Sequence, residues 1–104
     1  MAVVLAAFIA GCGGGSGASQ SEKDQATAAA KQAYKQASAS GPDLSAGPCI
    51  SEGLPGLSDW VADIAHDPRQ SVDDQPANQC QSYRSGQAHH FVELTPDGQL
   101  IRAQ

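Results

Sequence analysis

Large apolar side chains and basic residues are both scarce in this 104-residue sequence. Aromatic residues make up 5% of the chain, and its six Lys and Arg residues are scattered singly rather than gathered in a run. Without a basic stripe, the chain lacks the electrostatic footprint of a nucleic-acid-binding protein, so we expect no nucleic-acid partner. Its net charge of −5 gives no attraction toward anionic lipid headgroups either. Any link to a membrane must therefore come from something other than surface charge.

Motifs for nucleophilic catalysis and phosphate binding are also missing from the sequence. There is no G-x-S-x-G nucleophile elbow. The glycines at 13–17 do not follow a strand, as those of a phosphate-binding loop would. So short a chain also leaves little room for a deep substrate cleft. We therefore expect a protein that is not an enzyme and that needs no cofactor.

An unbroken apolar run, AVVLAAFIA, occupies residues 2–10. Its nine residues are too few to cross a bilayer as a helix, which needs roughly 20, but they suit the h-region of a secretory signal peptide. The run Ile9-Ala10-Gly11-Cys12 resembles the lipobox of bacterial lipoproteins, in which an aliphatic and two small residues precede the cysteine that receives a lipid. The sequence departs from that pattern in having no Lys or Arg before the apolar run.

This resemblance implies a division of the chain into three parts. Residues 1–11 would be the signal peptide, residues 12–20 a flexible Gly- and Ser-rich tether, and residues 21–104 one small domain. Cys12 would become the N-terminus and carry a covalent lipid, and a second acyl group would make the anchoring stable. The protein would then be exported and held at the periplasmic or extracellular face of a membrane.

Cys49 and Cys80 remain once Cys12 is assigned to the lipid. Outside the cytoplasm, two such cysteines are most simply a disulfide. The bond would close a loop of about 32 residues and stabilise the domain by about 3–4 kcal/mol, which is comparable to the net stability of so small a domain. Neither cysteine belongs to a Cys-x-x-Cys motif, which argues against redox catalysis. No close ligand spacing supports a metal site at these cysteines.

The domain is predicted to be α+β and to begin with an Ala-rich helix. Residues 25–38 are strong helix formers, a capping box begins at Ser21, and Gly41-Pro42 supplies a stop signal. The helix has almost no large apolar residues. One of its faces is a stripe of alanines, namely Ala26, Ala30, Ala33 and Ala37. We expect a loosely packed stalk, and the alternative is a helix docked through Tyr34.

Residues 57–68 form the second element, and they fit two structures. As a helix, they place their apolar residues on one face, with the spacing of Leu57, Trp60, Val61, Ile64 and Ala65. As a strand, they alternate between two faces. The helix matches more apolar positions, so we favour it slightly over the strand. The segments on either side, 41–57 and 68–87, are rich in Gly, Pro and polar residues and are predicted to be loops.

The C-terminal residues predict an antiparallel hairpin. Residues 88–94 and 99–103 flank the turn sequence TPDG, which is typical of a type I turn followed by a left-handed glycine. This turn sets the pairs across the hairpin, which are Leu94 with Leu100 and Val92 with Arg102. A lone hairpin is barely stable, so we expect residues 59–66 to add a third strand or a packed helix.

Three histidines, at 66, 89 and 90, are the candidate metal ligands. Adjacent His89 and His90 would point to opposite faces of a strand, so at most one could join a given site. The candidate set is His66, His90, Asp63 and Asp67. The sequence has no H-E-x-x-H motif, and histidines that pack at a sheet edge or face solvent are the favoured interpretation.

Trp60 and Arg69 are the candidates for contact with a protein partner, because Trp and Arg are enriched in binding hot spots. Core packing is nevertheless the favoured role for the only tryptophan of the chain.

The leading hypothesis is a lipid-anchored envelope or cell-surface protein with a non-enzymatic interaction or structural role. A metal-binding lipoprotein that uses His and Asp ligands is the first alternative. The second is a pilin-like subunit, because a helix followed by a small sheet and a disulfide loop resembles a reduced pilin head. The nine-residue apolar run cannot form the long hydrophobic stem of that family.

Overall fold

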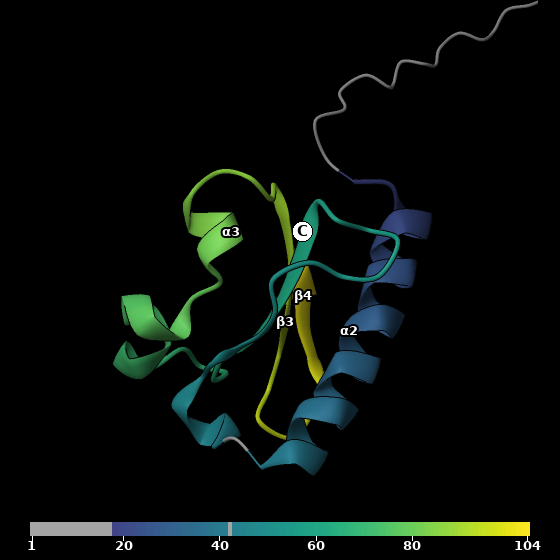
Figure 1. The fold of residues 1–104 in the computed structure, drawn as a ribbon. Coiled ribbons are helices and arrows are strands. Elements are labelled where there is room, and N and C mark those ends of the chain that lie inside the picture. Colours follow the sequence, from purple (N-terminus) through teal and green to yellow (C-terminus); the bar gives the residue numbers. More distant parts are fainter. Residues whose placement is uncertain (1–17, 42) are drawn as a thin grey trace, which may run out of the picture.

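The computed structural model describes residues 18–41 and 43–104. The apolar run, the lipobox-like residues and Cys12 lie outside the described residues, so the signal peptide and the lipid stay predictions. The described chain is α+β, as predicted, with helix α2 (Gln20–Ser40) packed on a mixed sheet. Figure 1 shows α2 on one side of this sheet and the short helix α3 (Gln81–Arg84) on the other.

Within the described residues, four strands lie side by side in the order of the sequence. They are β1 (Cys49–Ser51), β2 (Trp60–Ile64), β3 (His90–Leu94) and β4 (Leu100–Ala103). The central strands β2 and β3 are parallel, and β1 and β4 each pair antiparallel at an edge. Parallel neighbours need a long crossover connection, which residues 65–89 supply.

The segments predicted as loops contain short helical turns. The crossover holds η3 (Ser71–Asp74), η4 (Pro76–Asn78) and α3. The segment before β2 holds η2 (Leu44–Ala46) and strand β1. These turns satisfy backbone groups locally, so a polar connection can run over one face of the sheet without regular pairing.

The helix favoured for the second element is wrong, because residues 60–64 are strand β2. This strand runs in register beside β3, with Trp60 opposite His90 and Ile64 opposite Leu94. Trp60 and Ile64 are fully buried toward α2, whereas Val61 is buried on the other side of the sheet. A central strand covered on both faces is apolar at successive positions, and this pattern also satisfies a helical face.

Helix α2 begins earlier than predicted. Its cap is Ser19 rather than Ser21, and the Ser19 hydroxyl accepts a hydrogen bond from the backbone N–H of Glu22 at 3.1 Å. At the other end, Gly41 adopts a left-handed conformation (φ 99°), as a helix stop requires. The predicted stop is therefore confirmed at Gly41.

The helix is docked on the sheet, so the alternative to a free stalk is confirmed. Ala26 and Ala30 are fully buried, and their small side chains let the helix approach the sheet closely. The Tyr34 hydroxyl donates to the carbonyl oxygen of Pro96 at 2.9 Å. Near the start of the helix, the indole N–H of Trp60 donates to a Glu22 carboxylate oxygen at 2.7 Å.

The predicted hairpin forms, but with a shifted register. Leu94 lies opposite Leu100 as predicted, whereas Val92 lies opposite Ala103 and not Arg102. A bulge next to Leu94 inserts the extra residue that causes this shift. As a result, Arg102 lies opposite Glu93 and brings its charge to the face of the sheet that α2 does not cover.

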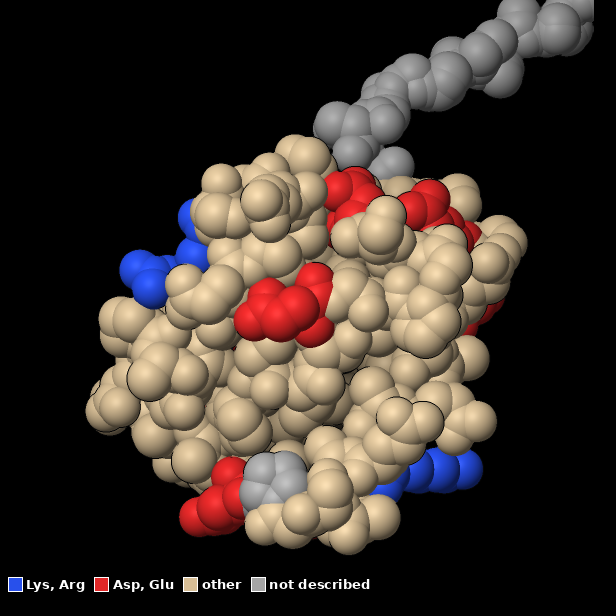
Figure 2. All heavy atoms as spheres, viewed as in Figure 1, with Lys and Arg blue, Asp and Glu red and all other residues tan. Residues whose placement is uncertain are grey.

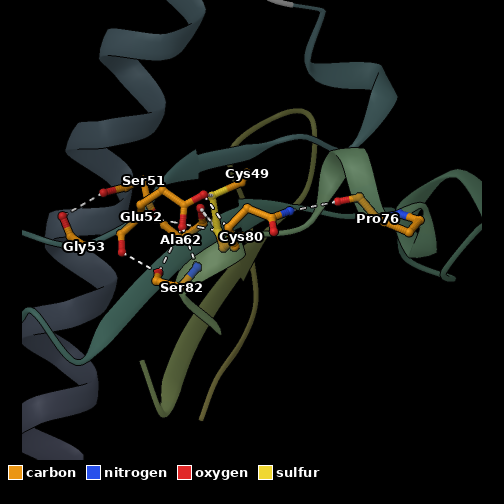
Figure 3. Close-up of a disulfide and its surroundings, with 9 residues drawn as sticks. Cys49, Ser51, Glu52, Gly53, Ala62, Pro76, Cys80 and Ser82 are labelled. Atoms are coloured by element: carbon orange, nitrogen blue, oxygen red, sulfur yellow. Dashed lines mark hydrogen bonds between the residues drawn. A yellow bond between two sulfur atoms is a disulfide. The ribbon is translucent and has the colours of Figure 1, made fainter. Parts of the chain in front are cut away.

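Cys49 and Cys80 form the predicted disulfide. It joins the edge strand β1 to the crossover just before α3, as Figure 3 shows. Beside it, the Glu52 carboxylate accepts hydrogen bonds from the backbone N–H groups of Gln81 (3.0 Å) and Ser82 (2.9 Å). A covalent bond and a charged cap therefore hold the crossover against the sheet at the same place.

Candidate ligand-binding cleft

A cleft of about 370 Å³ lies on the sheet face opposite α2, beneath the crossover. Strand residues form its floor, and these are Val61, Asp63, Phe91, Glu93 and Arg102. Crossover residues form its wall, and these are Arg69, Gln79, Cys80 and Tyr83. This volume falls within the range of about 300–1,000 Å³ that is usual for small-molecule sites.

One end of the cleft is apolar. The Phe91 and Tyr83 rings meet edge to face with their centroids 5.3 Å apart, the favourable arrangement for two aromatic rings. Val61 and Cys80 are buried beside them. Tyr83 remains 42% exposed, so this wall presents apolar surface that a ligand could cover.

The other end of the cleft is charged. The Glu93 carboxylate, which is 8% exposed, lies 2.6 Å from Arg69 Nη1 and 3.0 Å from Arg102 Nε. Arg69 Nε also donates to the Asp74 carboxylate at 2.9 Å. The hydrogen bonds to Asp74 and Glu93 raise the pKa of Arg69 further above its ordinary value. Arg69 therefore remains charged, and Glu93 lies between the two guanidinium groups.

Asp63 lies on the cleft floor opposite Glu93 in the parallel register. Its Oδ1 is buried and has no hydrogen-bond partner among the described residues. Burial, and then the Glu93 charge, raise the pKa of Asp63 to about 7, although the Arg69 charge acts to lower it. The cleft therefore contains a carboxyl group that changes its charge near neutral pH.

The position of the Arg69 wall depends on the fully buried Asp73. Its carboxylate accepts hydrogen bonds from the backbone N–H groups of His66 and Gln70, both at 2.9 Å, and lies 2.9 Å from His66 Nδ1. Burial acts to raise the pKa of Asp73, but these hydrogen bonds outweigh it and leave the pKa lowered. Gly47 packs so closely here that a Cβ atom would lie 2.5 Å from Asp73 Oδ1.

The structure does not bring the four candidate metal ligands together. Asp63 lines the cleft, while His90 stacks on Trp60 on the opposite face of the sheet, with ring centroids 4.8 Å apart. His66 contacts Asp73, and Asp67 is exposed. In the described part of the chain, a group of three ligand side chains forms only at Cys49, Glu52 and Cys80. Its two sulfur atoms are already bonded to each other.

The two adjacent histidines do share one neighbour, which the strand alternation did not predict. His89 Nδ1 lies 2.7 Å from Asp59 Oδ1, and His90 Nε2 lies 3.5 Å from Asp59 Oδ2. His89 precedes β3, so the alternation of side chains along that strand does not apply to it.

Of the two candidates for partner contact, Arg69 lines the cleft. Trp60 is fully buried and cannot contact a partner, so its favoured role in core packing is confirmed. The sequence did carry one signal for the cleft that we missed. Asp63 and Glu93 are ionisable residues inside apolar strands, and a charge placed there needs a partner or a function.

Charged side chains on the visible face in Figure 2 form separate spots rather than a continuous patch. Within residues 18–41 and 43–104, no helix has both the length and the apolar character needed to span a membrane. Comparisons of the chain with protein-family models, curated proteins and solved structures find no match. The cleft is therefore assigned from its own geometry.

Proposed function

We propose that this chain is an exported, lipid-anchored envelope or cell-surface protein that acts by binding, with the cleft as its binding site. The lipobox-like residues 9–12 support the anchor. The Cys49–Cys80 disulfide suits an oxidising compartment outside the cytoplasm. The observation that carries the binding role is the unpaired Oδ1 of Asp63 on the cleft floor. A buried acceptor without a partner costs about 1–3 kcal/mol, which a donor from a ligand would recover.

The residues that line the cleft suit binding better than catalysis. Among these described residues there is no Ser, Thr, His or Lys, and the Cys80 sulfur is already in the disulfide. Glu93 is ion-paired with two arginines, which leaves Asp63 as an acid–base group with no nucleophile beside it among the described lining residues. A charged end beside an aromatic end is the usual composition of a site that orients an amphipathic ligand.

The anchor is tested by fractionating cells that express the full chain or its Cys12→Ala variant. We expect the full chain in the membrane fraction, with incorporation of labelled palmitate, and the variant in the soluble fraction. Equal distribution of the two proteins would overturn the anchor.

The cleft is tested by screening a fragment library against the full chain labelled with 3-fluorotyrosine. Only two tyrosines are present, so ¹⁹F NMR reports Tyr83 in the cleft and Tyr34 on the other side of the sheet. We expect fragments that bind to shift the Tyr83 resonance and leave the Tyr34 resonance in place. A screen in which no fragment shifts the Tyr83 resonance would overturn the cleft as the binding site.

One observation favours metal binding as a second candidate function. Where a neutral His66 ring donates from Nδ1 to the Asp73 carboxylate, Nε2 is left as one metal-ligand atom, although no group of three ligand side chains in the described residues includes it. A carboxylate behind the imidazole is a common arrangement in metal sites. Titration of the full chain with Zn²⁺ is expected to raise its unfolding midpoint, and His66→Ala should remove the effect. An unchanged midpoint would exclude this candidate.

A further inference from the structure

We propose that the cleft binds a primary ammonium group carried on an apolar stem, with Asp63 as the counter-ion. This inference rests on the proposed function, because it names the ligand chemistry of the same site. An amine of this kind has two sources, a small free amine or the side chain of a lysine in a peptide. The chemistry is the same for both, and the test separates them.

Each side-chain nitrogen of Arg69 already donates to an acceptor other than Asp63. Arg69 directs Nε to Asp74, Nη1 to Glu93 and Nη2 to the carbonyl oxygen of Asp73. Arg102 Nε lies 3.0 Å from Glu93 Oε1 as an ion pair, but within the described residues this oxygen receives no hydrogen bond either. In the described part of the chain, Oδ1 of Asp63 thus receives no hydrogen bond although it shares a cleft with two arginines. Both carboxylate oxygens, Asp63 Oδ1 and Glu93 Oε1, are therefore available to a donor that a ligand brings.

The balance of charge around the cleft favours a cation. When Asp63 is ionised, the two carboxylates and two guanidinium groups that line the cleft balance, and the Asp74 carboxylate, which pairs with Arg69 from outside the lining, brings the sum to one negative charge. The further carboxylate that acts on Asp63, that of Asp73, is paired with His66 outside the cleft lining. An ammonium group would neutralise the excess, whereas a carboxylate ligand would increase it.

The aromatic end of the cleft determines the chemistry of the part of the ligand that carries the ammonium group. Phe91 and Tyr83 offer ring surface beside the charged end, and Val61 is buried next to them. A stem of a few methylene groups or one phenyl ring would cover this surface. A cation close to an aromatic face gains further attraction from the ring. The cleft volume of about 370 Å³ accommodates a ligand of this size.

Ammonium binding through Asp63 must be linked to pH. The pKa of Asp63 is raised to about 7 by burial and by Glu93, and a cation binds to the ionised form. Asp63 would be about one-tenth ionised at pH 6 and about nine-tenths ionised at pH 8, so the affinity should rise on the order of tenfold between these values. A neutral ligand of the same shape should not show this rise.

The experiment uses three probes with similar bodies and different charges, namely 2-phenylethylamine, 2-phenylethanol and 3-phenylpropanoate. Each is titrated into the full chain labelled with 3-fluorotyrosine at pH 6 and pH 8. We expect the amine alone to move the Tyr83 resonance in a saturable way, and to bind about tenfold more tightly at pH 8. The Asp63→Asn variant should weaken amine binding by at least tenfold. The matched Asp97→Asn variant, on the exposed hairpin turn, should leave it unchanged.

A second pair of probes separates the two sources. N-acetyl-lysine methylamide carries the lysine ammonium, and N-acetyl-norleucine methylamide has a similar stem without it. Binding of the lysine derivative alone supports the inference with a peptide as the source. Binding of 2-phenylethylamine without the lysine derivative supports it with a free amine.

Three results would overturn the inference. The alcohol or the carboxylate could bind at Tyr83 as tightly as the amine, Asp63→Asn could leave amine binding unchanged, or no probe could move the Tyr83 resonance. In the first two cases the cleft remains a binding site and only its ligand class is wrong. In the third case the independent fragment screen decides whether the proposed function fails as well.

Discussion

The substitution Asp63→Asn is expected to prevent most of the loss of stability that the wild-type protein undergoes between pH 5 and pH 8. The pKa of Asp63 is about 7 in the folded chain and 3.8 as the ordinary value, because burial and the Glu93 charge disfavour the carboxylate. The folded state therefore holds this proton more tightly than the unfolded state. Below pH 3.8 Asp63 does not lower the free energy of unfolding. Its destabilising contribution grows as the pH rises toward 7 and is constant above that.

The shift of about 3 pKa units corresponds to about 4 kcal/mol in full, and about 2–3 kcal/mol of this falls between pH 5 and pH 8. Four other carboxyl groups act in the opposite direction, since hydrogen bonds lower the pKa values of Asp43, Glu52, Asp59 and Asp73. Their contribution to stability is lost as the pH falls through the acid range, chiefly below pH 5. Between pH 5 and pH 8 the pH dependence of the free energy of unfolding therefore reports Asp63 rather than these four groups.

The assay is urea unfolding of the oxidised full chain at pH 5, 6.5 and 8, with wild type, Asp63→Asn and the exposed control Asp97→Asn. The difference in free energy of unfolding between each variant and wild type removes the contributions of the other groups, because these titrate in both proteins. We expect the free energy of unfolding of Asp63→Asn to gain on wild type by about 2–3 kcal/mol across the interval. Parallel pH profiles for the wild type and Asp63→Asn would mean that Asp63 titrates as an exposed carboxyl, and would refute our account of the cleft floor.

Three further substitutions test the contacts that hold the fold. Replacing both Cys49 and Cys80 with alanine should cost about 3–4 kcal/mol, because the unfolded chain gains loop entropy; an unchanged urea midpoint would contradict this. Gly98→Ala should destabilise more than Gly86→Ala. Both have positive φ (89° and 85°), but only at Gly98 would a Cβ meet the ring of the helix tyrosine, at 2.7 Å, while no described atom lies within 4 Å at Gly86. Equal losses of stability in the two variants would show that the ring of the helix tyrosine does not lie against Gly98. Glu22→Ala should cost about 1–3 kcal/mol and shift the indole N–H resonance of the buried tryptophan, whose hydrogen bond it removes. An unmoved resonance would show that this bond is absent.

Local chemistry explains which elements could be predicted from the sequence. The TPDG turn needs only its own residues, so the hairpin and the Leu94–Leu100 pair followed from it. The helix stop at Gly41 is equally local. The disulfide followed from the redox environment that a lipoprotein implies, together with the number of cysteines that remain.

Contacts between distant segments explain the rest. Strand β2 pairs with β3, whose first residue lies 30 positions beyond Trp60, so the spacing of apolar residues within 57–68 could not distinguish strand from helix. The cleft likewise depends on the crossover that brings Arg69 to Glu93, and on the bulge that turns Arg102 toward the same carboxylate. Neither of these contacts with Glu93 can be inferred from residues that are adjacent in the sequence.

The in-register pairing of β2 and β3 has a practical consequence for protein engineering. Since Trp60 pairs with His90, residues of both central strands that share parity also share a face. Even-numbered positions point toward α2, and odd-numbered positions such as 63 and 93 point into the cleft. A combinatorial library restricted to the odd positions would therefore vary ligand recognition, while every member would keep the same packing between the sheet and α2.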